Sequence, residues 1–231
     1  MYLLRAAGVI LSTIFYGTIS LLASFFDPNG EVQNKIAQRW ARSLLWVGGV
    51  RVEVQNGDRI PLTGSYVIAS NHLSFMDTPV VLGNIAAQFR FMAKEGLFRI
   101  PLLGTHLARA GHIPVPLEDP RGALKSMAHA ADVIKTRGVS VLIFPEGGRS
   151  ADGNLQDFKD GASYIAIKAG VPIVPVALIG TYEVLPLGGN KIRPGRVLLR
   201  VGEPIETAAL LLRDRRQVTE QIRRQIEAML R

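Results

Sequence analysis

Short apolar runs alternate with longer amphipathic stretches over most of this chain. Tyr66–Ser70 and Ser140–Phe144 are nearly continuous apolar runs, as expected of strands that are buried on both faces of a sheet. The alternation predicts an α/β fold: one domain with a largely parallel, mixed sheet flanked by helices. The expected strands are Val50–Val54, Tyr66–Ser70, Arg90–Ala93, Ile113–Val115, Ser140–Phe144, Ile173–Leu178 and Arg196–Val201. The expected helices are Pro79–Ala87, Pro120–Arg137, Phe158–Ala169 and Thr207–Arg231.

The chain that precedes this domain carries no Asp, Glu, Lys or Arg from Ala6 to Phe26. As a helix this stretch would be about 30 Å long, enough to cross the hydrocarbon core of a bilayer. Asp27-Pro28-Asn29-Gly30 then ends it with turn-forming residues. Several Ser, Thr and Tyr residues interrupt the apolar run, so a spanning helix and a helix in one leaflet both stay open. A cleaved signal peptide is disfavoured because no small-x-small site precedes Asp27.

A second amphipathic stretch follows this turn. Its apolar positions are Ile36, Trp40, Leu44 and Val47, and its basic positions are Lys35, Arg39 and Arg42. The pattern is typical of a helix at an anionic membrane interface, and the alternative is an ordinary helix packed on the globular domain. We expect residues 1–50 to be a membrane-associated helical segment and residues 51–231 to be the α/β domain. The basic residues after the apolar run outnumber those before it, which places the domain on the cytoplasmic face of the cell membrane.

The composition narrows the possible partners and cofactors. The net charge of +8, from 27 basic and 19 acidic residues, favours an anionic partner such as membrane lipid or a phosphorylated substrate. Aromatic residues make up only 7%, which disfavours nucleic acid because base stacking needs them. The absence of cysteine excludes a thiol nucleophile and an iron–sulfur cluster. His106, His112 and His129 lack helical ligand spacing, so we expect no metal site.

The first polar motif, Asn71-His72-Leu73-Ser74-Phe75-Met76-Asp77, directly follows a buried strand. The carboxyl ends of strands in an α/β sheet are where ligands bind. Side chains five positions apart diverge on a regular helix, so His72 and Asp77 meet only if His72 lies in the turn and Asp77 near the helix start. Pro79 supports that placement because proline is favoured in the first turn. A carboxylate on one imidazole nitrogen leaves the other to accept a proton from a hydroxyl.

The second polar motif, Phe144-Pro145-Glu146-Gly147-Gly148-Arg149-Ser150, follows the other buried strand and should face the same crevice. The two glycines permit close approach of the backbone to a ligand. Arg149 offers the planar donor fork that suits a phosphate. Glu146 is expected either to accept a substrate hydroxyl or to hold Arg149 in place.

Together the two motifs resemble the glycerolipid acyltransferase family that includes the 1-acylglycerol-3-phosphate acyltransferases. That family carries Asn-His-x4-Asp, then Phe-Pro-Glu-Gly-x-Arg-Ser, then a proline-containing apolar strand, which is Val171-Pro172-Ile173-Val174-Pro175-Val176 in this chain. The resemblance covers about residues 51–201. An apolar or amphipathic N-terminal membrane segment is also usual in the family.

The resemblance implies direct acyl transfer from acyl-CoA or acyl-carrier protein to the free hydroxyl of a lysophospholipid, 1-acylglycerol 3-phosphate, giving phosphatidic acid. His72 would be the general base and Asp77 its orienting partner. The substrate-binding residues would be Lys94, Glu146, Gly147, Gly148 and Arg149. No cofactor is implied, because the thioester is already activated. Membrane lipids, the acceptor and the acyl donor would be the partners.

One departure concerns the acceptor. The family usually has Gly-x-x-Phe-x-x-Arg, whereas Gly111–Leu117 places Pro114 at the aromatic position and Leu117 at the arginine position. Gly148 in place of the more usual Thr is a milder change. The alternative is therefore a related acyltransferase that acts on another lysophospholipid, an amino-acid lipid or glycerol 3-phosphate. A non-catalytic lipid-binding protein would not need both His72 and Asp77, and a membrane-anchored nucleic-acid binder conflicts with the sparse aromatics.

Overall fold

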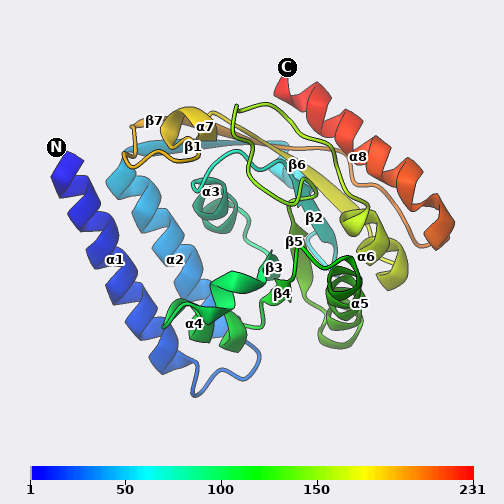
Figure 1. The fold of residues 1–231 in the computed structure, drawn as a ribbon, viewed down its shortest axis with the longest axis horizontal. Helices are drawn as coiled ribbons and strands as arrows, with labels where there is room; N and C mark the ends of the chain where they lie inside the picture. Colours follow the sequence, from blue (N-terminus) through cyan, green and yellow to red (C-terminus); the bar gives the residue numbers. More distant parts are fainter. Residues whose placement is uncertain (1) are drawn as a thin grey trace.

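The computed structural model describes residues 2–231, and Figure 1 shows one sheet between two groups of helices. The sheet has seven strands in the order β1-β7-β6-β2-β5-β3-β4. The strands are β1 (Val50–Gln55), β2 (Val67–Ser70), β3 (Phe89–Lys94), β4 (Ile113–Val115), β5 (Ser140–Ile143), β6 (Ile173–Ile179) and β7 (Gly195–Val201). Neighbouring strands run parallel except for β6 and β7, which are antiparallel. The predicted mixed, largely parallel sheet is thus confirmed.

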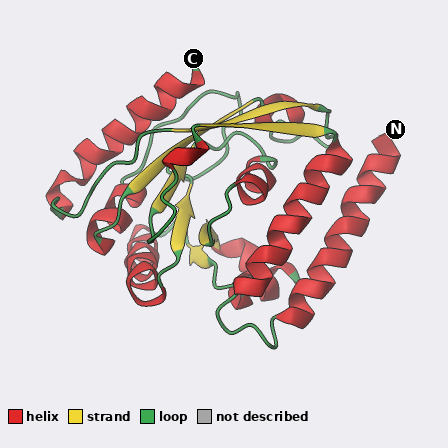
Figure 2. Ribbon diagram, turned by 180° about the vertical axis from the view of Figure 1, so that it is seen from behind, coloured by secondary structure: helices red, strands yellow, loops and turns green. Residues whose placement is uncertain are grey.

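The helices lie on both faces of this sheet (Figures 1 and 2). They are α1 (Tyr2–Ala23), α2 (Glu31–Gly48), α3 (Asp77–Asn84), α4 (Leu103–Arg109), α5 (Pro120–Arg137), α6 (Gly161–Ala169), α7 (Thr181–Val184) and α8 (Arg215–Leu230). The described residues also contain the 3₁₀ turns η1 (Gly57–Arg59), η2 (Glu95–Arg99) and η3 (Leu212–Asp214). One face carries α3 and the antiparallel hairpin of α1 and α2, and the other carries α5, α6 and α8.

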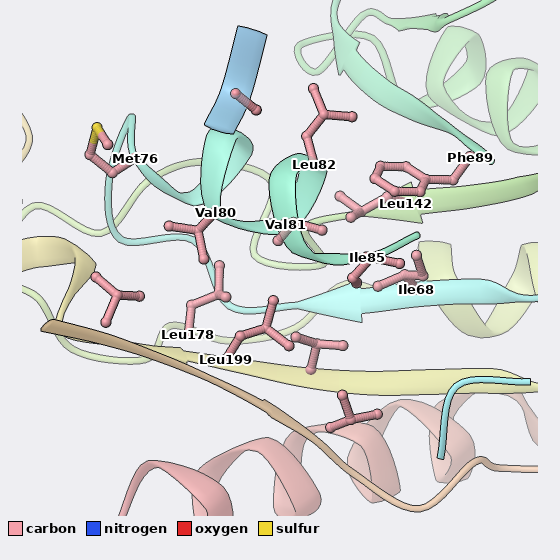
Figure 3. Packing of buried hydrophobic residues seen from close by; sticks show 14 of the residues in the cluster. Ile68, Met76, Val80, Val81, Leu82, Ile85, Phe89, Leu142, Leu178 and Leu199 are labelled. Carbon is pink, nitrogen blue, oxygen red and sulfur yellow. The ribbon is translucent and has the colours of Figure 1, made fainter. Parts of the chain in front are cut away.

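The apolar core is divided by the sheet into two clusters. On the first face, Val80 and Val81 of α3 pack over Leu178 and Leu199 of the sheet (Figure 3). The second cluster places α5, α6 and α8 on the opposite face, with Ile165 as one of its fully buried members. Every residue of β2 and β5 is buried, so the two motif-bearing strands lie at the centre of the fold.

Local sequence signals account for the helix that was predicted best. The side chain of Asp119 accepts the backbone N–H of Arg121 at 3.0 Å and so caps α5, and Pro120 occupies its first turn. Gly138 ends α5 in the left-handed conformation, at φ 63°. Both predicted ends of this helix are confirmed.

Three expected helices differ from the structure at their ends, and one helical segment was not expected. The helix expected over Pro79–Ala87 is α3, which begins at Asp77 and ends at Asn84, because the backbone of Ile85 is extended. The tail is helical only from η3 onward; Thr207 is instead held in an irregular segment, because its hydroxyl donates to the carbonyl of Val171 at 2.6 Å. The helix expected at Phe158 begins at Gly161. The segment that contains η2 and α4 was not predicted.

The apolar stripe of α2 faces protein and not a membrane interface. Ile36 and Leu44 are buried, and Trp40 packs against the first core cluster while its indole N–H donates to Thr13 at 3.1 Å. By contrast, α1 leaves most of its apolar side chains exposed. Leu3–Ala23 has the length and the mean hydropathy, 1.8, of a helix that could cross a membrane, and only 6% of its most apolar window is buried.

Candidate active site

His72 and Asp77 form a hydrogen-bonded pair at the carboxyl end of β2. His72 lies in the turn after the strand, Asp77 is the first residue of α3, and Nδ1 of His72 is 2.7 Å from Oδ2 of Asp77. The predicted arrangement of the two side chains is confirmed. With Asp77 ionised, the proton of the imidazole lies on Nδ1, so Nε2 is left as the acceptor.

The carboxylate of Asp77 also organises the turn itself. Its Oδ2 accepts the backbone N–H groups of Leu73 at 2.7 Å and Ser74 at 2.8 Å, and the side chain is fully buried. Its Oδ1 is buried without a hydrogen-bond partner among the described residues. The same carboxylate therefore shapes the loop and fixes the tautomer of His72, which is the coupling that a general base needs.

Two further side chains hold His72 in place. Asn71, fully buried, bridges β2 to β6: its amide donates to the carbonyl of Leu178 at 2.9 Å and accepts the N–H of Leu178 at 2.8 Å. The ring of Phe144 stacks on the imidazole, with centroids 3.9 Å apart and planes at 11°. Phe144 of the second motif thus restrains the imidazole ring of His72, and Asn71 of the first motif restrains the backbone beside it.

Glu146 lies behind His72, and its pairing differs from the expectation. Oε1 accepts the backbone N–H of His72 at 2.6 Å, and Oε2 accepts that of Gln156 at 3.0 Å. No bond between Glu146 and Arg149 is formed, so the expected hold on Arg149 is wrong. Burial raises the pKa of Glu146 above its usual range, against the lowering effect of the two N–H donors.

Arg149 is held by an aromatic ring. Its guanidinium carbon lies 3.5 Å from the ring centroid of Phe75, which belongs to the first motif. Desolvation lowers the pKa of Arg149 somewhat, and the charge of Asp77 opposes that shift. The stacking leaves the edge of the guanidinium available for an anion.

The glycine turn brings in a cation that sequence reasoning missed. Gly147 has φ 75°, and Nζ of Lys159 lies 2.9 Å from the place that a Cβ on Gly147 would take. The position of Lys159 just before α6, after the second motif, is its only sequence signal. A Cβ on Gly148 would meet nothing within 4 Å, so this position is not restricted to glycine by a close neighbour.

Lys94 ends β3 with its side chain 60% exposed and 3.7 Å from the carboxylate of Glu118. It lines the same cavity as His72, as do Arg149, Lys159 and Leu117. The structure therefore brings all of the predicted site residues to one edge of the sheet, with Glu146 behind His72 and not in the cavity wall. Arg121, at the start of α5, is exposed and does not line the cavity.

The cavity has a volume of about 1240 Å³ and extends from His72 to the N-terminal hairpin. Its walls are mostly apolar and come from α1, α2, α3, α4 and β3. Val9 and Ile14 of α1 and Leu44 of α2 are examples. A polar rim with His72 and Arg149 thus leads into a large apolar space, the arrangement that suits an amphipathic ligand.

His106 and His112, which belong to neither motif, also line the cavity wall. Nδ1 of His112 accepts the backbone N–H of Phe91 at 3.0 Å, and burial lowers the pKa of His112 to about 3. His106 bonds Ser20 of α1 at 2.9 Å. Among the residues that the structure describes, no group of three His, Asp or Glu side chains could hold a metal ion.

Comparison with known proteins identifies a family for this chain. Residues 51–179 match the family model described as Acyltransferase. The chain is 34% identical to the chloroplast 1-acyl-sn-glycerol-3-phosphate acyltransferase LPAT1 of Arabidopsis thaliana over 78% of this chain and 51% of that protein. It is 32% identical to the 1-acyl-sn-glycerol-3-phosphate acyltransferase of Pseudomonas aeruginosa over 87% of this chain and 77% of that protein. The chain spans about half the length of LPAT1 and of a second chloroplast relative, from Brassica napus.

A solved structure has the same fold. The crystal structure of the 1-acyl-sn-glycerophosphate acyltransferase PlsC from Thermotoga maritima superposes with a TM-score of 0.80 and 30% identity, covering 98% of this chain and 95% of that chain. The family match, the identities and the superposition all agree with the paired motifs on β2 and β5. The chain therefore belongs to the acyltransferase family that includes the 1-acyl-sn-glycerol-3-phosphate acyltransferases.

Proposed function

We propose that this protein transfers an acyl chain from a thioester to the free hydroxyl of 1-acylglycerol 3-phosphate and so makes phosphatidic acid. The observation that carries the proposal is the His72–Asp77 pair, whose Nδ1 and Oδ2 atoms are 2.7 Å apart. His72 and Arg149 line the same mostly apolar cavity of about 1240 Å³. One edge of the sheet then brings together a base, an anion-binding side chain and an apolar space large enough for an acyl chain.

The reaction follows from the state of His72. Nε2 accepts the proton of the acceptor hydroxyl as its oxygen attacks the thioester carbonyl. The carbon–sulfur bond breaks, and the imidazolium returns the proton to the leaving thiolate. Asp77 holds Nδ1–H throughout and stabilises the positive ring. The products are the new ester and a free thiol, so no acyl-enzyme and no further cofactor are needed.

Three cations that line the cavity are the proposed ligands of the acceptor phosphate. Arg149 supplies a planar fork that is already oriented on Phe75, and it is the best candidate for a bidentate phosphate contact. Lys159 places an ammonium against the glycine turn, and Lys94 adds a charge at the end of β3. These side chains would replace the arginine that the family usually has where this chain has Leu117.

The proposed acyl donor is acyl-CoA or acyl-carrier protein, and the proposed location is the cytoplasmic face of the cell membrane. The exposed apolar side chains of α1 support membrane association. Both ends of α1 are held by other parts of the protein: Arg5 approaches Gly49 at the end of α2, and Ser20 bonds His106 of α4. A helix fixed at both ends to one side of a domain fits a single leaflet better than a crossing.

The direct test is incubation of the purified protein with labelled acyl-CoA or acyl-carrier protein and a panel of lysolipids. The panel includes 1-acylglycerol 3-phosphate, other lysophospholipids, an amino-acid lipid, glycerol 3-phosphate and a phosphate-free monoacylglycerol. Preferred acylation of 1-acylglycerol 3-phosphate supports the proposal. Preference for another acceptor assigns the alternative acyltransferase activity that Leu117 suggests, and transfer to no acceptor sinks both.

A further inference from the structure

The segment Glu95–Arg109, which contains η2 and α4, presents apolar side chains to the outside of the molecule. The exposed members are Leu97, Ile100, Leu102 and Leu103, and Leu102 is 71% exposed. Adjacent exposed aliphatic side chains on one short segment are costly in water, and such patches mark interaction surfaces. Arg99 and Arg109 lie on the same segment, so the patch carries cations at its edge.

This patch continues an apolar surface of α1. Ser20 and Ser24, in and just beyond the last turn of α1, hydrogen-bond His106 at 2.9 Å and Arg109 at 2.8 Å, respectively. The guanidinium of Arg109 also lies 4.3 Å from the ring centroid of Phe25. Phe25 and the neighbouring Phe26 are themselves strongly exposed. Figures 1 and 2 both place α4 beside this end of the hairpin.

The same segment forms part of the cavity wall. Leu97, Leu102 and Leu103 line the cavity that reaches His72. Leu102 also has φ 65° and ψ −54°, a conformation that bulky residues rarely adopt and that persists where packing enforces it. Packing is tight immediately afterwards, since a Cβ on Gly104 would collide with the carbonyl oxygen of Phe98. The strained backbone thus keeps Leu102 at the boundary between cavity and surface.

We propose that Glu95–Arg109 is a second membrane-contacting element, which inserts Ile100 and Leu102 among the lipid chains of an anionic bilayer beside α1. The inference rests on the proposed membrane association of α1. The continuous apolar surface from Phe25 to Leu102 and the cations Arg99 and Arg109 match the acyl region and the phosphates of a lipid surface. In that position the cavity wall faces the bilayer, from which a lipid substrate can arrive without crossing water.

Single-cysteine labelling tests this placement directly, because the chain has no native cysteine. An environment-sensitive fluorophore is attached to Ile100→Cys, Leu102→Cys, Leu11→Cys on α1, or Leu124→Cys on α5. Leu124 is 50% exposed, close to the 45% of Ile100, but lies on the opposite face of the sheet. Each labelled protein is mixed with vesicles of phosphatidylcholine and phosphatidylglycerol, with or without lipids that carry a quencher in the acyl chain.

The expected result is quenching at Ile100, Leu102 and Leu11 and none at Leu124. In addition, Ile100→Asp should weaken vesicle binding by about tenfold and Leu124→Asp should not, since only Ile100 would insert an aliphatic side chain into the bilayer. Quenching at Leu11 alone overturns the inference while the role of α1 stands. No quenching at any position overturns both. Emission at Leu102 that shifts with protein concentration in the absence of vesicles assigns the patch to a second copy of the chain and also overturns it.

Discussion

The carboxylate of Glu146 accepts the backbone N–H of His72 at 2.6 Å, so the motif after β5 fixes the backbone of the motif after β2. The link runs in both directions, because the backbone N–H of Ser150 donates to the carbonyl of His72 at 2.9 Å. His72 is therefore positioned by two strands, and the side chain that sequence analysis assigned to substrate binding supports the base from behind.

Glu146→Gln should lower kcat more than it changes KM. The amide offers only one acceptor oxygen for the N–H groups of His72 and Gln156, so the turn loosens while the cavity stays intact. We expect a loss of about tenfold in kcat, because charge-assisted bonds contribute about 1.5–3 kcal/mol. Steady-state rates against acceptor concentration measure the split. A rise in KM at unchanged kcat would return Glu146 to the role of a substrate ligand.

His72→Ala should reduce turnover by about a hundredfold or more, the usual contribution of a positioned base. Asp77→Asn should also cripple turnover, because an amide that donates to the imidazole would favour the wrong tautomer. Binding of the lysolipid, followed by equilibrium dialysis, should persist in His72→Ala. Near-normal turnover of His72→Ala on every active substrate would contradict the mechanism.

Arg149→Ala should raise KM for 1-acylglycerol 3-phosphate strongly, and Arg149→Lys should restore only part of it. Lysine reproduces the charge but not the bidentate geometry or the stacking on Phe75. Arg121→Ala is the matched control, because Arg121 is exposed outside the cavity. Initial rates with and without a phosphate on the acceptor measure the effect. Indifference of Arg149→Ala to both acceptors would point to an acceptor without phosphate.

Lys159→Met should raise KM for the phosphorylated acceptor severalfold and leave a phosphate-free acceptor unaffected. The methionine keeps much of the apolar stem and removes the charge that lies against Gly147. Gly147→Ala should have a similar effect, because its Cβ would displace the ammonium and the residue has φ 75°. Lys135→Met, at an exposed position on α5, is the control. Equal losses on both acceptors would make Lys159 a structural residue.

His112 should make the fold less stable in acid. Burial holds its pKa at about 3 against an ordinary value of 6.5, so the unfolded chain binds the extra proton between these values. Stability from this group is present above pH 6.5 and falls by about 2 kcal/mol by pH 5. His112→Gln should remove that loss, whereas His129→Gln on the exposed face of α5 should not. Urea unfolding at pH 7 and pH 5 measures the free energy of unfolding of each variant. The raised pKa of Glu146 changes this free energy with the opposite sign in all of them, so the test is the difference between variants.

Sequence analysis predicted the parts of the fold whose signals are local. The apolar runs of β2 and β5 and the caps of α5 are written in adjacent residues, and the two motifs were correctly placed at one sheet edge. The segment around Leu102 was missed because its short helix depends on a strained backbone and on tertiary packing of Gly104. Lys159 was missed for a similar reason: only the folded glycine turn shows that its ammonium belongs to the site.

Helix α1 supplies both an exposed apolar surface and part of the cavity wall. Leu11 and Phe15 on α1 are exposed and do not line the cavity, whereas Val9 and Gly17 line it, and a Cβ on Gly17 would meet nothing within 4 Å. Opposite sides of one helix therefore meet different surroundings. Among homologues we expect the outer positions to exchange freely between apolar residues, and the inner positions to change in side-chain size together with the length of the chains that each organism builds into its lipids.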